Sequence, residues 1–368
     1  MRPIPRGDDV DVTAVQMPID GGPVRREATM PIASVVVCTH NRAALLPALI
    51  AALQAQRGAG VFEVLIVDSA SSDATPACVA DLTARGHPEL RSLRLERPGL
   101  CRARNLGLEA AGGPIVVFID DDALPSPTWL AMMCAAFDDQ TVGGAGGPVR
   151  LRFEEPPPPW LDRRLRSFLT AYDLGREARR IEYTRGMEEY PRGANFAVRR
   201  SAALAAGGFR PLFERHGRGL RSNDELDLCF RMERGGWHLQ YVLATVDHLV
   251  SRERLQPGWF LRRFAAQGES DALFEIANRG LRSALGRLRW YYARRLRFPT
   301  RGAGGAAVTE ELVRECERRE AWGYLRGVLW GAPLLLATGR DRPHQVTVGQ
   351  RPIPSRSATS GAKAAAGE

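Results

Sequence analysis

Short apolar runs alternate with stretches of helical periodicity over the first third of the chain, and this alternation limits the fold more than any other feature. The apolar runs are rich in β-branched residues and end at turn residues, as buried strands do. The expected strands are residues 34–38, 62–67, 90–96 and 114–119, and the expected helices are residues 43–56, 74–85 and 103–111. This order predicts an α/β fold with a mostly parallel central sheet flanked by helices.

Polar residues follow three of the predicted strands at the points where the strands end. They are residues 39–42, 68–73 and 120–122. Ligands of open α/β sheets bind outside the carboxyl ends of the strands, where such segments meet. The sequence therefore predicts a ligand site at this edge of the sheet.

The rest of the chain is less regular. Four consecutive prolines at residues 156–159 predict a stiff, extended linker. We expect a helix at 161–185, a strand at 193–198 with a short helix to 206, a helix at 224–234, a strand at 239–246 that ends at Asp247 and His248, and basic helices from 259 onward. Residues 1–30 and 350–368 are expected to be disordered tails.

Three consecutive acids, Asp120, Asp121 and Asp122, end the fourth predicted strand. Clustered carboxylates repel each other, and their pKa values rise unless a cation neutralises them. On an extended chain, Asp120 and Asp122 point to the same side, so one Mg²⁺ or Mn²⁺ ion could join them to a diphosphate. The alternative, which the three acids alone favour slightly, is a solvated acidic turn in which Asp122 caps a helix.

Asp68 and the basic segment 97–105 form two further candidate sites near strand ends. Asp68 could accept hydrogen bonds from a ribose or a base, or it could form an ordinary Asx-turn. Arg102 and Arg104 stand at a predicted helix start, and both guanidinium groups and helix N-termini suit a diphosphate. The alternative is a solvated basic face.

Asp224 and Glu225 stand at the start of a predicted helix. Acids in this position are often only partners of the helix dipole, but a positioned carboxylate can also act as a general base. His248 could complete a metal site as a neutral imidazole, although a single histidine is more often structural.

Taken in order, these segments resemble the inverting glycosyltransferases of family 2, which have a GT-A fold. The resemblance covers roughly residues 34–271. The matching segments are residues 35–42, 64–75, 99–107, 115–122 followed by Trp129 and Leu130, 193–198, 207–209 and 224–231. The resemblance implies a GT-A domain at 31–275, with a nucleotide-binding half at 31–142 and an acceptor half at 143–275, and a basic helical C-terminal region at 276–349.

The resemblance also implies how a nucleotide-diphosphate sugar donor would bind. The residues expected at the donor are Thr39, Asn41, Arg42, Asp68, Arg102, Arg104, Asn105, Asp120 and Asp121. Asp120 and Asp122 would form the DxD pair that holds Mg²⁺ or Mn²⁺, and His248 would join them as a metal ligand.

The catalytic step implied by the resemblance is a single in-line displacement that inverts the anomeric carbon, as in a hexosyltransferase. Glu225 stands at the position of the general base. The family usually has Glu-Asp before this helix, whereas this chain has Asp224 followed by Glu225. The identity of the base is therefore open between these two residues.

The net charge of +9 fits an anionic partner, which would be a nucleic acid, an anionic lipid or a phosphorylated small molecule. The alternative is that a GC-rich coding sequence favours arginine. A basic nucleic-acid-binding protein is one alternative function, and a catalytically idle GT-A scaffold is another. Because nucleic-acid-binding motifs are absent from the sequence, we expect no nucleic-acid partner. The expected role is cell-surface polysaccharide or glycan synthesis.

Six cysteines occur singly and none forms a CxxC pair, which fits a reducing cytoplasm. Basic and aromatic residues gather at 281–298, and an apolar stretch follows at 322–337. These helices could contact the anionic inner face of a membrane, which would favour a lipid-linked acceptor over a free saccharide. The alternative, slightly favoured, is that they pack on the catalytic domain.

Overall fold

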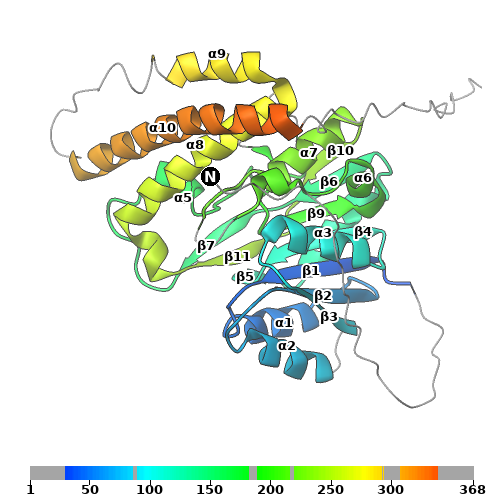
Figure 1. Cartoon of the computed structure of the whole chain (residues 1–368). Helices are drawn as coiled ribbons and strands as arrows, with labels where there is room; N and C mark the ends of the chain where they lie inside the picture. The colour runs from blue at the N-terminus through cyan, green and yellow to red at the C-terminus, as the bar shows by residue number, and fades with distance from the viewer. Residues whose placement is uncertain are drawn as a thin grey trace, which may run out of the picture.

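The computed structural model describes residues 30–85, 89–181, 189–215, 219–291, 293 and 307–338 (Figure 1). Apart from Met30, both predicted tails lie outside the described residues. Helices flank a central sheet, and three C-terminal helices form a further layer. The expected α/β fold with a mostly parallel sheet and a C-terminal helical extension is confirmed.

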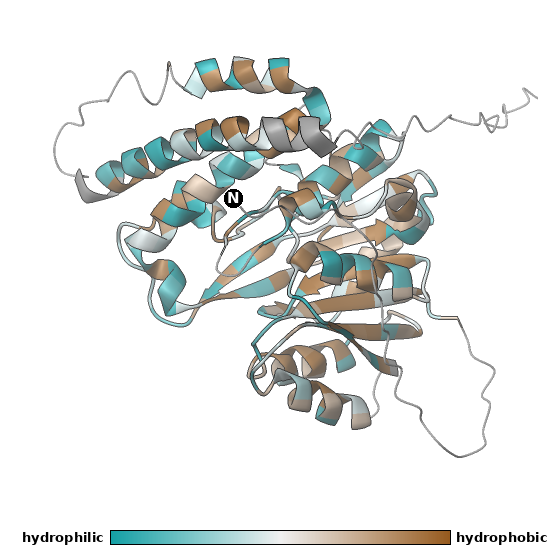
Figure 2. Cartoon of the chain, in the orientation of Figure 1, coloured by the Kyte–Doolittle hydropathy of each residue, from teal (hydrophilic) through white to brown (hydrophobic). Residues whose placement is uncertain are grey.

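The first half of the central sheet is parallel. Its strands are β1 (Ala33–Thr39), β2 (Phe62–Ser69), β3 (Glu89–Leu95) and β4 (Ile115–Asp120), arranged in the order β3-β2-β1-β4. Helices α1 (Leu46–Gln54), α2 (Thr75–Ala84) and α3 (Leu100–Ala110) connect them. The apolar strands form the interior (Figure 2). The strand order reverses at β1, so the carboxyl ends of β1 and β4 flank the point where such sheets bind ligands.

The second half of the sheet mixes directions. Strand β9 (Asn195–Arg199) runs antiparallel between β4 and β6 (Val142–Gly146). Next come β10 (His238–Tyr241), parallel to β6, and the edge strand β8 (Arg179–Ile181). The helices of this half are α4 (Trp129–Ala135), α6 (Arg200–Ala205) and α7 (Asp224–Arg234), and the last has the predicted bounds.

A second, three-stranded sheet has the order β5-β11-β7. Its strands are β5 (Ala123–Pro125), β7 (Val149–Phe153) and β11 (Val246–Val250). The single strand predicted at 239–246 is therefore wrong. The chain leaves the central sheet after Val242, whose N–H donates to the carbonyl of Gly146, and enters the second sheet as β11. His248 consequently lies within a strand and not just beyond its end.

The helix predicted at 161–185 is also wrong, because α5 (Arg163–Ser167) is the only α-helix within its described part, residues 161–181. Asp162 caps α5 by accepting a hydrogen bond from the N–H of Leu165 at 2.9 Å. Thr170 then adopts a positive φ, which ends the helical path, and Tyr172 pairs through its backbone with Val149. Residues 182–185 of this prediction lie outside the described residues.

The C-terminal layer consists of α8 (Pro257–Arg279), α9 (Leu281–Tyr291) and α10 (Ala307–Thr338) (Figure 1). Helices α8 and α10 pack with their backbones in close contact. A Cβ atom at Gly323 of α10 would clash with the carbonyl of Ala265, and one at Gly268 of α8 would clash with that of Glu320. Over the part of the chain that the structure covers, no helix combines the length and apolar character needed to cross a membrane.

Candidate active site

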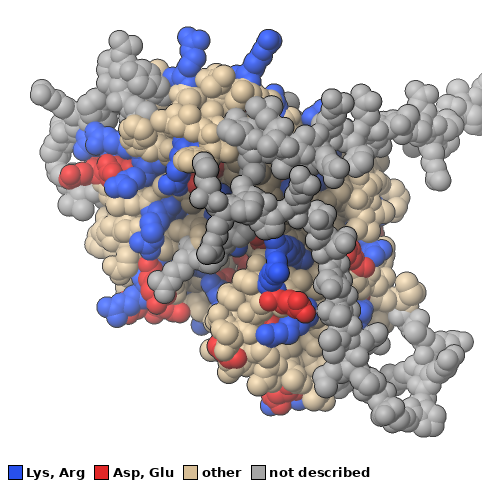
Figure 3. Space-filling view, in the orientation of Figure 1, with Lys and Arg blue, Asp and Glu red and all other residues tan. Residues whose placement is uncertain are grey.

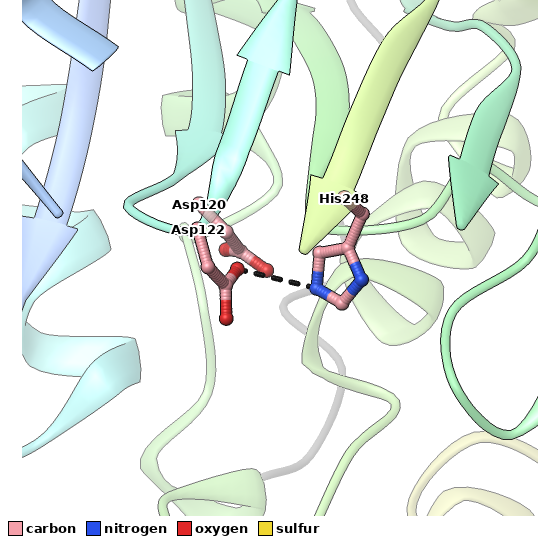
Figure 4. Close-up of side chains that lie close together, drawn as sticks. All are labelled: Asp120, Asp122 and His248. Carbon is pink, nitrogen blue, oxygen red and sulfur yellow. Dashed lines mark ion pairs between the residues drawn. The ribbon is translucent and has the colours of Figure 1, made fainter. Parts of the chain in front are cut away.

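Asp120, Asp122 and His248 come together at the carboxyl end of β4 (Figure 4). Asp120 ends β4, Asp122 lies in the turn to β5, and His248 lies on β11, which pairs with β5. One ligand atom from each side chain lies within 4.8 Å of the others. The aspartates converge through a turn, so the extended geometry expected for this segment is wrong although the two side chains do meet.

These three side chains fit a divalent metal ion. The Nε2 atom of His248 lies 3.2 Å from Oδ1 of Asp122. The Nδ1 atom of His248 is buried without a hydrogen-bond partner among the described residues. Carboxylates favour Mg²⁺ or Mn²⁺, and imidazole is a common metal ligand. Nε2 also lies 3.3 Å from Nη1 of Arg254, and a cation bound at this nitrogen would need it deprotonated.

Two arginines flank the buried carboxylate of Asp122. Nη1 of Arg42 lies 2.6 Å from it and Nη2 of Arg254 lies 3.0 Å from it. Burial alone would raise the pKa of Asp122, but the hydrogen bond and charge of His248, together with both arginines, outweigh burial and lower that pKa. Asp122 is therefore ionised at neutral pH, as a metal ligand has to be.

The loop after β1 reaches the same acids. The hydroxyl of Thr39 donates to Asp121 at 2.9 Å, and Arg42 contacts the other carboxylate oxygen of Asp121 at 2.9 Å. Burial, reinforced by the charge of Asp122, raises the pKa of Asp121 to about 7 although Arg42 opposes the shift. Asn41 has a positive φ and its side-chain oxygen accepts a hydrogen bond from the N–H of Ser72 at 2.8 Å. Three residues predicted to bind the sugar donor, Thr39, Asn41 and Arg42, thus connect the loops that follow β1, β2 and β4.

Asp68 lies beside this loop, since β1 and β2 pair Thr39 with Asp68. Its carboxylate accepts a hydrogen bond from the N–H of Ser71 at 2.9 Å and forms an ion pair with Arg94. Asp68 therefore forms the local turn considered as the alternative role. It also lies at the strand end where a nucleotide would be expected.

Arg104 connects the acids of β4 with those of α7. Its buried guanidinium donates to Asp224, lies 3.5 Å from Asp120 and lies 3.9 Å from Glu225. Burial alone would raise the pKa of Asp224, but the charge of Arg104 outweighs burial and lowers it. Asp224 is thus a buried, ionised carboxylate whose charge is balanced by Arg104. Arg104 lies between the acids of the candidate metal site and the two candidate bases.

Glu225 differs from Asp224 in exposure and in charge state. Its side chain is 17% exposed, and Oε1 accepts a hydrogen bond from the N–H of Gly193 at 3.2 Å. Burial and the nearby charge of Asp224 raise the pKa of Glu225 to about 7. A carboxyl group with this pKa can take up a proton near neutral pH, as a general base must.

Residues 34–206 match the family model described as glycosyl transferase family 2. The chain carries a family 2 glycosyltransferase domain. The match includes Asp120 and Asp122, whereas Glu225 and His248 lie beyond its end. The family places this domain among the transferase enzymes.

Curated relatives of the glycosyltransferase domain include a pre-mycofactocin glycosyltransferase of Mycobacterium tuberculosis, 28% identical over 246 residues, or 65% of this chain and 46% of the relative. Another is a glucosyl-dolichyl phosphate glucuronosyltransferase of Haloferax volcanii, 27% identical over 49% of this chain and 57% of the relative. The chain thus spans about half the length of these relatives. Among solved structures, a mannosyltransferase of Pyrobaculum calidifontis in complex with GDP-Man and Mn²⁺ has a TM-score of 0.46 and 22% identity, covering 85% of this chain and 80% of that chain.

In this glycosyltransferase domain, the start of α3 is not open to a diphosphate as the sequence suggested. The buried carboxylate of Glu214 accepts hydrogen bonds from the N–H groups of Cys101 at 3.0 Å and Arg102 at 3.3 Å. The side chain of Arg102 is exposed, so the structure does not bring it to the acids as it brings Arg104. Asn105 instead holds the backbone of Phe209 through two hydrogen bonds of 2.7 and 2.8 Å.

Helix α8 holds the loop that leads into α7 of the glycosyltransferase domain. Asn223 donates to Asp271 at 2.8 Å, and Arg221 pairs with Glu269 at 2.5 Å. Glu269 also pairs with Arg326 of α10 at 2.9 Å. Sequence reasoning missed these contacts, and it missed Arg254 and Glu214, because their partners are far away in the sequence.

Proposed function

We propose that the chain is an inverting, metal-dependent glycosyltransferase that moves a sugar from a nucleotide-diphosphate sugar to a saccharide or lipid-linked acceptor. The observation that carries this proposal is that Arg104 lies close to both Asp120 and Glu225. Asp120 in turn belongs to the candidate metal site with Asp122 and His248. Side chains that would hold a metal ion are thereby linked to a carboxyl group with a pKa of about 7, and Asp120 and Asp122 belong to the segment that matches the family 2 model.

In the proposed reaction, Glu225 accepts the proton of the acceptor hydroxyl as that oxygen attacks the anomeric carbon. The bond to the leaving diphosphate breaks on the opposite side of this carbon, so the configuration inverts. Glu225 can act at neutral pH because its pKa is close to 7. Asp224, with a lowered pKa, keeps Arg104 in place and cannot serve as well.

The loops after β1, β2 and β4 would bind the nucleotide, through Thr39, Asn41, Arg42, Asp68 and Asp121. Asp120, Asp122 and His248 would hold Mg²⁺ or Mn²⁺, which, when bound, neutralises the charge that builds up on the leaving diphosphate. Arg42 and Arg254 already flank Asp122 and would keep the local charge balanced as a diphosphate enters or leaves.

A peripheral contact with an anionic membrane is part of the proposal. Trp322, Arg326, Leu329 and Trp330 share one face of α10, and Trp330 is 76% exposed. Arginine side chains gather over the C-terminal helices on the face seen in Figure 3. Exposed aromatic and basic residues on one helix face suit the surface of anionic lipids.

This contact would place the enzyme on the cytoplasmic face of a membrane, where a lipid-linked acceptor is accessible. One relative is named a glucosyl-dolichyl phosphate glucuronosyltransferase, which supports an acceptor of this kind. The corresponding role is the synthesis of cell-surface polysaccharide or glycans.

Release of nucleoside diphosphate from a panel of nucleotide sugars, with Mn²⁺, Mg²⁺ or EDTA, tests the proposal. We expect turnover with one donor class, loss of turnover in EDTA, and loss in Asp122→Ala. Asp247→Ala is the matched control, because Asp247 is an exposed acid next to His248 on β11. If Asp122→Ala keeps full turnover, the metal assignment is wrong. If DNA raises the melting temperature and nucleotide sugars with Mn²⁺ do not, the nucleic-acid alternative replaces the enzyme.

A further inference from the structure

Two arginines near Glu225 have buried N–H groups that no described residue accepts. These atoms are Nε of Arg192 and Nη1 of Arg263. A buried donor without an acceptor destabilises the folded state, and a charged donor does so more strongly. Two such groups in one neighbourhood indicate that an acceptor atom belongs there.

Both arginines lie on the side of the site that holds the candidate base. Arg192 directly precedes Gly193, whose N–H donates to Glu225 at 3.2 Å. Arg263 lies on α8, and its ionisation responds to the charges of Glu225, Arg192 and Arg215. Arg192 thus adjoins the backbone that holds Glu225, and the charges of both residues act on Arg263.

Aromatic rings hold these two guanidinium groups by their faces. Arg192 lies 5.7 Å from the ring centre of Tyr172, and Arg263 lies 5.7 Å from that of Phe168. A guanidinium packed on a ring keeps the N–H groups at its edge for bonds in its own plane. This edge suits the paired oxygens of a carboxylate or a phosphate.

Burial opposes the positive charge of Arg263. Burial lowers the pKa of Arg263 to about 10, and the like charge of Arg215 adds to the effect. Burial also raises the pKa of both nearby carboxyl groups, Glu225 and Asp271. Asp271 is further committed to a hydrogen bond with Asn223. An anion beside Arg263 would favour its charged form.

We propose that Arg192 and Arg263 bind an anionic oxygen group of the acceptor, next to the hydroxyl group that Glu225 deprotonates. The inference rests on the proposed function and names the class of acceptor: a saccharide with a carboxylate or one with a phosphate. The donor diphosphate has cations of its own at Asp122, namely Arg42 and Arg254.

Calorimetry on the full chain, with the donor site filled by nucleoside diphosphate and Mn²⁺, tests this site with three probes. The probes are glucuronate, glycerol phosphate and neutral glucose. We expect one of the two anions to bind at least about tenfold more tightly than glucose, and which one it is distinguishes an acidic sugar from a lipid-type phosphate. Arg263→Gln and Arg192→Gln each reduce this binding by about tenfold, which is the loss of 1.4 kcal/mol expected for one charged hydrogen bond.

Arg262→Gln is the matched control, because Arg262 is the exposed neighbour of Arg263 on α8, and it leaves anion binding unchanged. Melting temperatures test whether the variants are folded. If Arg263→Gln is unfolded, the conclusion is drawn from Arg192→Gln. Equal binding of anions and glucose overturns the inference, and so does a loss of nucleoside diphosphate affinity in Arg263→Gln with unchanged anion binding. Failure of the nucleoside diphosphate itself to bind with Mn²⁺ would instead overturn the proposed function, and the anion titration is repeated without it.

Discussion

The guanidinium of Arg104 lies 3.5 Å from the carboxylate of Asp120 and links the end of β4 to the start of α7. Its main ion pair, with Asp224, is buried on both sides. Removing one partner of such a pair leaves an uncompensated charge in the interior. The two halves of the proposed active site therefore depend on one side chain of α3.

Replacement of this side chain by Arg104→Met is expected to lower the free energy of unfolding by about 3–5 kcal/mol. Chemical denaturation measures the effect. Arg102→Met is the matched control on the same helix, and because Arg102 is exposed, its change should stay within about 0.5 kcal/mol. Equal effects of the two variants would show that the buried pair does not stabilise the fold.

The pH dependence of kcat/KM should report Glu225. Because its pKa is raised to about 7 and the base form is the deprotonated one, kcat/KM should rise with pH and level off above about pH 7. Glu225→Gln should lower kcat by about 10²–10⁴-fold. A Gln variant that keeps the wild-type profile would assign the base to another group.

The raised pKa of Glu225 also predicts how the stability of the fold depends on pH, which can be measured without a substrate. A folded-state pKa of about 7, above the ordinary 4.5, means that the folded protein binds this proton more tightly than the unfolded chain. Wild-type stability should therefore fall as the pH rises from about 4.5 to 7, and Glu225→Gln should show a smaller fall, because Asp121, whose pKa is also raised to about 7, keeps its share. Unfolding curves at pH 5 and pH 8 compare the two proteins, and parallel changes would contradict the raised pKa.

His248→Ala should weaken binding of Mn²⁺, measured by electron paramagnetic resonance with nucleoside diphosphate present. We expect a loss of at least about tenfold, since even residues that only support metal ligands contribute that much. His238→Ala, on β10 of the central sheet, is the control and should leave Mn²⁺ binding unchanged. A similar loss in both variants would point to a general effect on the fold.

The contact between α8 and α10 can be tested with two glycines of opposite surroundings. Gly323→Ala should destabilise the C-terminal layer, because the new Cβ would clash with the carbonyl of Ala265. Gly286→Ala meets nothing within 4 Å and should raise the free energy of unfolding by about 0.5–1 kcal/mol through higher helix propensity. Thermal unfolding of both variants tests this contact. Melting temperatures that shift in the same direction would contradict the close packing of α8 and α10.

The exposed face of α10 predicts binding to vesicles that contain anionic lipid. The double variant Trp322→Ala and Trp330→Ala should reduce co-sedimentation with such vesicles by about tenfold, and added salt should weaken the wild type as well. Leu204→Ala, at an exposed position on α6, should change nothing. Wild-type protein that binds neutral and anionic vesicles equally would contradict the proposed role of the arginines.

The parallel half of the sheet could be predicted because its information is local. The buried runs of β1, β2 and β4 are continuous in the sequence, and the acids that end them meet once the strands are parallel. The roles of Glu225 and His248 could be predicted only from the family resemblance. One acid before a helix, or one histidine, does not by itself indicate a function.

The remaining features depend on contacts between distant segments. Strand β9 enters the sheet antiparallel although its own sequence does not specify direction. Arginine-rich periodicity suggested a long helix after residue 161, but the positive φ of Thr170 and the pairing of Tyr172 with Val149 override it. The partners of Arg254 and Glu214 lie more than one hundred residues away along the chain.

Glu269 serves two arginines at once: Arg221, three residues before Asp224, and Arg326, on the outward face of α10. The two arginines use different oxygens of this carboxylate, Oε1 for Arg221 and Oε2 for Arg326. An anionic surface that attracted Arg326 would leave Glu269 with Arg221 alone. The outermost helix α10 and the loop before α7 are thus joined to α8 through one side chain.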